Sequence, residues 1–370
     1  MTRRRASLLI VQSLIGLGLL GAWAYAVDLR EVGRTLSQAR WALVLAAALG
    51  LSSSLVRSVR WRMVLRPVAL VPLLDLWLIS MASSLVNFVI PVRSGEVARG
   101  LLLKQRPNVS FAASLPTLAV HRSFDLLVVL MLVAAGALFG VHLEGLLSAV
   151  LIAGGIVLLA LALFMILAIW ARSRLLIAAD RLMPRLLGPS LRRRLLGILE
   201  GFITGFTTIG RRPQDLASLL GLSMAAALID ASMFYCLFVG VGAVLAPAIV
   251  ITGYSLFVVT FLVPGAPGFV GSYEAFGSLV FGAVGVRAEI AASTVVLSHA
   301  LSALMLGITG GAAMWVLGLR PGQAIRTFIS PTPDLLVLLT SPGFRPIVSD
   351  GAWNENAVTL LPAPPAGRYD

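Results

Sequence analysis

The sequence is poor in the residues on which soluble domains and metal centres depend. Charged residues make up 12% of its 370 residues, against roughly a quarter in a typical soluble domain. The lone cysteine, Cys236, excludes an intramolecular disulfide and a cysteine-pair metal site. The three histidines, His121, His142 and His299, lack metal-ligand spacing, so we expect no metal and no cofactor. These scarcities exclude a soluble core and argue against metal chemistry.

Apolar residues dominate instead. Hydrophobic residues make up 58% of the chain and the mean hydropathy is +0.95, which predicts an all-α polytopic membrane protein. The net charge of +13 is nearly all arginine, because Lys104 is the only lysine. Arginine in membrane proteins gathers on the cytoplasmic side and meets anionic lipids of that leaflet. Basic and aromatic residues do not interleave, so we expect no nucleic-acid partner.

The chain opens with a basic cluster before an apolar run at 6–27. This arrangement resembles a signal peptide, but the run is about 22 residues long and lacks a clear cleavage site. We therefore expect a retained first transmembrane helix with a cytoplasmic N-terminus, followed by an outside loop, together spanning 1–40.

We expect about six full spans, with the remaining five at 41–56, 112–141, 146–170, 214–240 and 289–318. Arg57, Arg60, Arg62 and Arg66 follow the second span and mark its cytoplasmic end. The segment 142–213 holds the fourth span and a basic amphipathic stretch on the cytoplasmic leaflet. The proline-rich segment 321–370 is expected to be a flexible cytoplasmic tail. Both termini would then face the cytoplasm.

Two apolar segments are broken by proline and glycine. The run 67–90 ends at Pro91, and the stretch beyond it, 96–103, is too short to cross about 30 Å of hydrocarbon. We therefore expect a re-entrant hairpin that enters from the cytoplasm. The segment 243–286, broken at Pro264 and Gly268, is expected to form a second hairpin of opposite sense, the alternative being two full passes of about 20 residues each.

These segments predict an inverted repeat. Span, hairpin and span at 41–141 match span, hairpin and span at 214–320, with the sense of insertion reversed. Broken helices that meet near the bilayer midplane form the binding sites of many transporters.

Ionisable residues inside a membrane mark candidate sites. Arg93, Arg99 and Arg122 can donate to a lipid phosphate. The carboxylates can orient these arginines, bind a cation or relay protons, and the broken helices can act as gates. The candidate substrate-binding residues are Asn87, Arg93, Glu96, Arg99, Arg122, Asp125 and Glu274, and the candidate gating or coupling residues are Pro91, Gly95, Asp230, Pro264 and Gly268.

A structural alternative stays open for the same residues. Arg93 can pair with Glu96, and Arg122 with Asp125, in ion pairs that only stabilise the hairpin and the third span. His299 alone on the last span is more typical of a hydrogen-bonded packing residue. No Ser/His/Asp order and no paired-aspartate metal motif is legible, so we expect no catalytic residue and no enzyme activity.

Four motifs carry a family likeness: Arg60-Trp61-Arg62-x-x-Leu65-x-Pro67, Asn87-x-x-x-Pro91-x-Arg93-x-Gly95-Glu96-x-x-Arg99, Arg122-x-x-Asp125, and Pro264-x-x-x-Gly268 with Glu274. They resemble the lysylphosphatidylglycerol synthase transmembrane region, the flippase-like module of bacterial multiple peptide resistance factors. The resemblance implies lipid translocation in a bacterial plasma membrane, with a substrate such as aminoacylated phosphatidylglycerol. The family usually has an acidic residue where His121 stands. Only a short tail follows the last span, so we expect no synthesis of lysyl-lipid.

The expected function is translocation of an anionic or zwitterionic phospholipid, or of a polyprenyl-phosphate lipid, through a central polar cavity. One alternative is a membrane subunit or enzyme of lipid-linked sugar or lipid modification, with a separately encoded soluble transferase as its partner. A scaffold that does not transport is the other.

Overall fold

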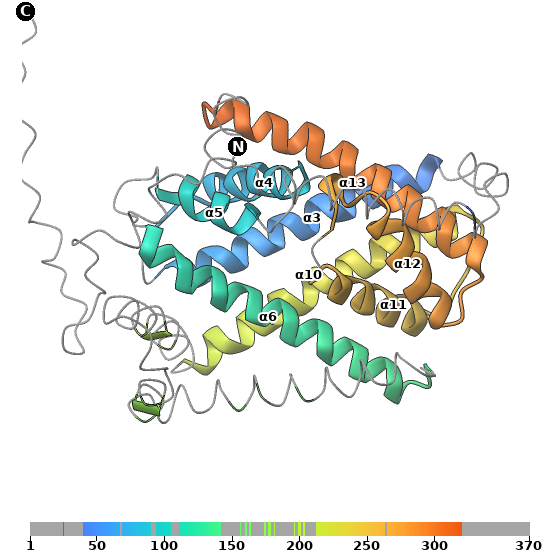
Figure 1. Cartoon of the computed structure of the whole chain (residues 1–370), viewed down its shortest axis with the longest axis horizontal. Coiled ribbons are helices and arrows are strands. Elements are labelled where there is room, and N and C mark those ends of the chain that lie inside the picture. Colours follow the sequence, from blue (N-terminus) through green and yellow to red (C-terminus); the bar gives the residue numbers. More distant parts are fainter. Residues whose placement is uncertain are drawn as a thin grey trace, which may run out of the picture.

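A computed structural model describes residues 40–66, 69–89, 94–104, 111–141, 212–262 and 265–319, together with isolated positions elsewhere. Within these residues the chain is helical and has no strand, which confirms the all-α prediction (Figure 1). The elements in chain order are α3 (Arg40–Leu65), α4 (Leu73–Val89), α5 (Ser94–Lys104), α6 (Phe111–Leu138), α10 (Pro213–Gly240), α11 (Pro247–Thr260), the 3-10 turn η1 (Pro267–Phe269), α12 (Ser272–Ala283) and α13 (Ala288–Val316).

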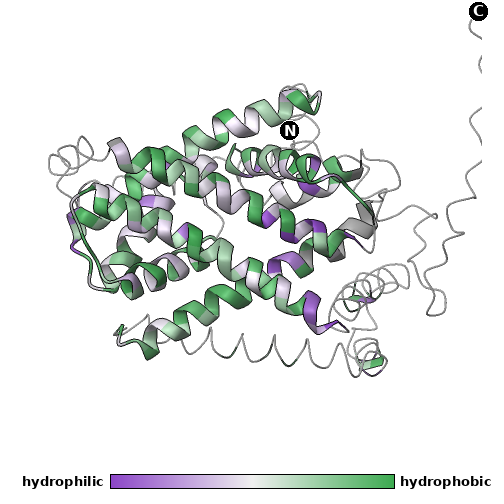
Figure 2. Ribbon diagram, turned by 180° about the vertical axis from the view of Figure 1, so that it is seen from behind, coloured by the Kyte–Doolittle hydropathy of each residue, from purple (hydrophilic) through white to green (hydrophobic). Residues whose placement is uncertain are grey.

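Four of the described helices are long and apolar enough to cross a membrane: α3, α6, α10 and α13. Figure 2 shows apolar residues along most of the helical ribbon. The chain is therefore a membrane protein. The predicted spans at 6–27 and 146–170, the basic segment and the tail lie outside the described residues apart from isolated positions.

The predicted end of the second span was wrong. We expected a span at 41–56 with the arginines beyond it, but α3 and its candidate span continue to Leu65. Arg57 and Arg60 thus lie inside the helix, where carboxylates of α6 and α10 pair with them. An arginine whose charge is matched can stay within a bundle, so it need not mark the membrane surface.

Both proline-broken segments contain short helices. In the first, α4 packs against α5, and in the second, α11 packs against α12 beyond η1. With 14 and 12 residues, α11 and α12 rise about 21 and 18 Å, less than the roughly 30 Å of a hydrocarbon core. Neither helix can cross a bilayer by itself.

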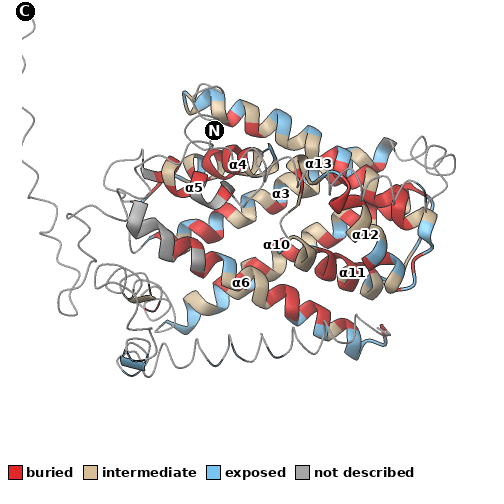
Figure 3. Cartoon of the chain, viewed as in Figure 1, coloured by how far each residue is buried: buried red, intermediate tan, exposed pale blue. Residues whose placement is uncertain are grey.

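Helices of the two predicted repeats, 41–141 and 214–320, pack against each other. Helices α3 and α10, with which the two predicted repeats begin, pack along each other, while α4 packs against α13 and α11 packs against α6. In Figure 1, α4 and α5 lie at one end of the molecule, and α11 and α12 lie at the other. Buried residues gather where the helices meet, whereas the outward face of α13 is largely exposed (Figure 3).

Two glycines allow short helices to pack closely on long ones, α4 on α13 and α11 on α6. A Cβ at Gly310 of α13 would lie 2.6 Å from the Cβ of Leu85 on α4, and a Cβ at Gly136 of α6 would overlap the side chain of Thr252 on α11. Both helix pairs therefore approach closely only because these positions lack a side chain.

Candidate functional site

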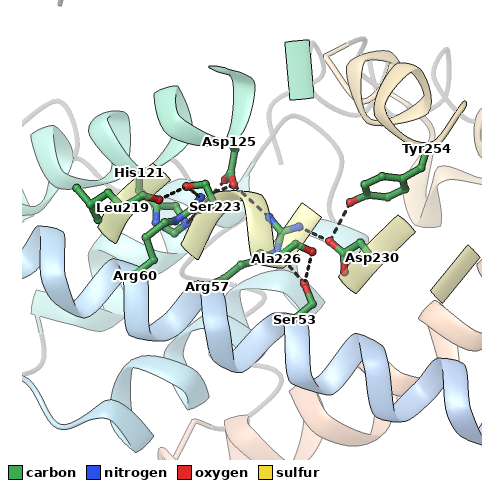
Figure 4. Close-up of polar contacts among 10 residues, drawn as sticks. All are labelled: Ser53, Arg57, Arg60, His121, Asp125, Leu219, Ser223, Ala226, Asp230 and Tyr254. Atoms are coloured by element: carbon green, nitrogen blue, oxygen red, sulfur yellow. Dashed lines mark hydrogen bonds and ion pairs between the residues drawn. The ribbon is translucent and has the colours of Figure 1, made fainter. Parts of the chain in front are cut away.

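A charged cluster lies where α3, α6 and α10 meet (Figure 4). Arg57 of α3 is its centre: Nη1 donates to Oδ1 of Asp125 on α6 at 3.2 Å, and Nη2 donates to Oδ2 of Asp230 on α10. One guanidinium thus joins carboxylates from two other helices. We call Arg57, Arg60, Asp125 and Asp230 the charged cluster.

Arg60 is the fully buried arginine of this cluster, with no exposed surface. Its Nη1 lies 2.7 Å from Oδ1 of Asp125 and donates to the Ser223 hydroxyl at 2.6 Å. Its Nη2 lies 2.9 Å from Nε2 of His121. Because a guanidinium can only donate, the His121 Nε2 accepts and the ring is a neutral imidazole with its proton on Nδ1.

Asp230 extends the cluster to the second hairpin. The Tyr254 hydroxyl of α11 donates to Oδ2 of Asp230 at 2.8 Å. The carboxylate therefore receives one bond from α3 and one from α11, so movement of α11 would change its surroundings. The predicted coupling residue, for which the sequence suggested no partner, has two.

Helical spacing explains why these side chains converge. Ser53, Arg57 and Arg60 are separated by four and three positions on α3, which places them on one face. Ser53 supports the arrangement, because its hydroxyl accepts from Arg57 Nε at 3.4 Å and bonds to the Ala226 carbonyl of α10 at 3.3 Å. His121 and Asp125 are four apart on α6 and share a face in the same way.

The charges of the cluster cancel, because two arginines face two aspartates. Charge in an apolar bundle is costly unless it is paired, and this pairing removes much of the cost. The two arginines differ in access. The Arg57 side chain is 33% exposed and the Arg60 side chain is 0% exposed. Part of the Arg57 side chain is therefore accessible without any separation of the helices.

The first hairpin places other predicted residues outside this cluster. The Gly95 N–H donates to Oδ1 of Asn87 at 3.4 Å, which links α5 to α4. The Arg99 guanidinium lies 5.1 Å from the Trp61 ring centroid, a cation–π contact with α3. Pro91, Arg93 and the Glu96 side chain lie outside the described residues.

Arg122 and Asp125 do not follow the predicted local pairing. Asp125 binds Arg57 and Arg60 of α3, and Arg122 is exposed. The two residues are three positions apart on α6, so their side chains leave the helix in directions about 60° apart. The Asp125 carboxylate instead forms its ion pairs with the arginines of α3. The predicted ion pair is replaced by one between helices.

Glu274 and Gly268 belong to a second polar site. Glu274 binds His299 of α13 and the Gly271 amide, and the Gly268 carbonyl also contacts His299. His299 was expected to be a hydrogen-bonded packing residue, and each of its ring nitrogens has a polar partner. Pro264 lies outside the described residues.

Sequence analysis did not identify four members or partners of the charged cluster as site residues: Arg57, Arg60, Ser223 and Tyr254. A signal for the arginines existed: Asp125 and Asp230 each need a cation, and Arg57 and Arg60 share a helical face. The described residues contain no group of three or more His, Cys, Asp or Glu that could hold a metal ion. The contacts observed in the charged cluster are ion pairs and hydrogen bonds.

Comparison with known proteins places the chain in a family. Searches of curated proteins and of solved structures gave no significant match. The family model described as "Lysylphosphatidylglycerol synthase TM region" matches residues 6–310, more than half of the chain, and suggests a lipid-related membrane function. The chain therefore belongs to the lysylphosphatidylglycerol synthase transmembrane-region family.

Proposed function

We propose that this protein translocates a phosphate-bearing lipid across the membrane, the substrate being an anionic or zwitterionic phospholipid or a polyprenyl-phosphate lipid. The headgroup passes through the interior of the helix bundle and contacts the charged cluster, while the acyl or prenyl tails stay in the bilayer. Family membership supports a lipid substrate.

The observation that carries the proposal is the charged cluster itself. Four ionised side chains within membrane-spanning helices are costly to keep and are typical of substrate or ion pathways. Arg57 is the accessible member, and its planar fork matches the oxygens of a phosphate. A phosphate replaces one aspartate as its partner, and that aspartate then turns to the water or to the amine of the headgroup.

The two proline-broken segments are the elements that move during translocation. Helices α11 and α12 are too short to cross the bilayer, which favours a re-entrant second hairpin over two full passes. The exchange of partners, α4 on α13 and α11 on α6, is the contact pattern expected of an inverted repeat. We place both termini on the cytoplasmic side of a bacterial plasma membrane.

Residues of the first hairpin have proposed roles that complement the cluster. Arg93, Arg99 and Arg122 would receive the phosphate on the cytoplasmic side, with Glu96 and Asn87 ordering that entrance. Pro91, Gly95, Pro264 and Gly268 would act as hinges.

The direct test is lipid translocation by purified protein in liposomes. A phosphatidylglycerol with a fluorescent acyl chain is placed in both leaflets, and a membrane-impermeant quencher reports exchange between them. Wild-type protein should accelerate exchange over protein-free vesicles. Because a charged hydrogen bond contributes about 1.5–3 kcal/mol, Arg57→Gln should slow exchange by roughly tenfold or more.

Ser232→Ala is the matched control, because Ser232 is an exposed residue on α10 whose hydroxyl bonds only its own helix at the Leu228 carbonyl. This variant should exchange lipid at the wild-type rate. Wild-type vesicles that exchange lipid no faster than protein-free vesicles would favour a scaffold or a subunit of a lipid-modifying complex.

A further inference from the structure

The second polar site lies at the break between η1 and α12, where the ring of His299 is held on both sides. Its Nδ1 lies 2.5 Å from Oε1 of Glu274, and its Nε2 lies 2.7 Å from the Gly268 carbonyl oxygen. His299 and Glu274 are 8% and 7% exposed. The pair is therefore shielded and is bonded at each ring nitrogen.

The donors and acceptors at this site require a proton inside the pair. A carbonyl oxygen only accepts, so the His299 Nε2 carries a hydrogen. A neutral ring with that hydrogen has a lone pair on Nδ1, and an ionised Glu274 would present a second lone pair to it. The short contact therefore needs one more proton, shared between Nδ1 and Oε1.

Neighbouring groups fit a ring that carries this proton. The Tyr273 ring stacks on His299 with centroids 4.2 Å apart and planes 11° apart, a geometry that favours a cationic imidazole. Glu274 keeps its other oxygen on the Gly271 N–H at 2.8 Å, which caps α12. The proton thus joins the start of α12, the η1 turn and α13.

The site also touches the first hairpin. Phe88 of α4 lies edge-on to His299 at 5.9 Å between ring centroids, and at 6.4 Å from Phe269 of η1. The turn between them is conformationally unusual, since Gly268 has φ 67° and Phe269, which is not glycine, has φ 57°. A residue with a side chain in this region is strained and stays there only if its surroundings hold it. The His299 bond to the Gly268 carbonyl is one such restraint.

We propose that Glu274 and His299 form a proton-binding site. Release of its proton sets the lone pairs of Nδ1 and Oε1 against each other, so the His299 ring turns away and its Nε2 leaves the Gly268 carbonyl. The η1 turn is then free, and the two hairpins separate where Phe88 meets Phe269. Lipid translocation would then be coupled to proton movement. This inference rests on the proposed function, because it supplies the energy source for the same transport cycle.

The charged and titratable groups around His299 are few in the part of the chain that the structure describes. Helix α12 presents the titratable groups Glu274 and Tyr273, whereas the contacts from α4 and η1, the Phe88 ring and the Gly268 carbonyl, carry no titratable group. On α3 and α10, which also pack against α13, Arg57 and Asp230 bond each other. The shared proton therefore lies between Glu274 and His299.

Nitrogen NMR of isotope-labelled histidine in lipid bilayers tests the proton site without any transport assay. The chain has three histidines, so loss of one signal in His299→Gln assigns the resonance. Near neutral pH, wild-type His299 should show Nε2 protonated and Nδ1 sharing a proton. Glu274→Gln should convert it to a neutral ring with a single N–H. A bare Nδ1 in the wild type, unchanged by Glu274→Gln, would overturn the proposal.

Transport in liposomes with an imposed pH gradient tests the coupling. Wild-type exchange should respond to the gradient, by up to about tenfold per pH unit for one obligatory proton. His299→Gln and Glu274→Gln should lose that response. Thr294→Val is the matched control, because Thr294 is a buried α13 residue whose hydroxyl has no hydrogen-bond partner among the described residues, and it should respond as the wild type does.

The outcomes separate the two proposals. Wild-type exchange that is fast but indifferent to the gradient contradicts proton coupling and leaves translocation standing. An absence of exchange under every condition contradicts translocation, while the NMR result still decides whether the proton is bound. Melting temperatures of both variants show whether the protein remains folded, and if neither folds, the wild-type NMR spectrum is decisive.

Discussion

Replacing each arginine of the charged cluster by glutamine separates a structural role from a ligand-binding one. Arg60 has no exposed surface and contacts Asp125, Ser223 and His121. Arg60→Gln leaves Asp125 with one arginine and removes the donor to His121. Removing one partner of a buried ion pair costs about 3–5 kcal/mol, so this variant should be strongly destabilised.

Arg57→Gln should behave differently. Its side chain is 33% exposed, whereas that of Arg60 is 0% exposed, so its loss should cost less, about 1–3 kcal/mol. Asp125 keeps Arg60, and Asp230 keeps the Tyr254 hydroxyl. We therefore expect Arg57→Gln to fold with a modestly lower melting temperature and to lose lipid exchange.

Thermal and denaturant unfolding of the purified variants in detergent measures this difference. A second variant, Arg60→Gln combined with Asp125→Asn, should recover part of the stability lost by Arg60→Gln, because no uncompensated carboxylate is left. Equal destabilisation by the two single changes, or a larger loss for Arg57→Gln, would refute the division of roles.

Two further predictions concern packing and topology. Gly136→Ala should lower stability by about 1–3 kcal/mol because its Cβ meets Thr252, and Thr252→Ala should restore part of that loss in the double variant; additive losses in the unfolding measurement would contradict the close contact. Ser190→Cys in a Cys236→Ala background should react with an impermeant thiol reagent only from the cytoplasmic side, because arginine-rich loops stay there, and labelling of intact cells from outside would contradict the proposed orientation.

Much of the helical framework follows from hydrophobic length alone. The predicted span 214–240 corresponds to α10 at Pro213–Gly240, and the predicted span 289–318 corresponds to α13 at Ala288–Val316. The break at Gly268 was also legible, since proline and glycine interrupt a helix whatever surrounds them. Such features depend on local sequence, so they can be read without a partner.

The charged cluster could not be read in the same way, because it depends on contacts between helices. Arginine beside a span has two meanings, a cytoplasmic marker or the partner of a buried carboxylate, and only packing distinguishes them. Arg57 lies 173 positions from Asp230, and His299 lies 25 positions from Glu274. No spacing rule connects pairs so far apart. The local alternative, Arg122 with Asp125, was attractive because it needed no tertiary information.

The central claim is that a lipid phosphate reaches Arg57, and an experimental structure with the co-purified lipid tests it most directly. The protein would be purified in nanodiscs formed from native membrane, and the bound lipid would be identified by mass spectrometry. The account predicts a phosphate oxygen within about 3 Å of the Arg57 guanidinium, with the bond to Asp125 or Asp230 broken. Lipid found only around the outside of the bundle, with Arg57 still joined to both aspartates, would contradict it.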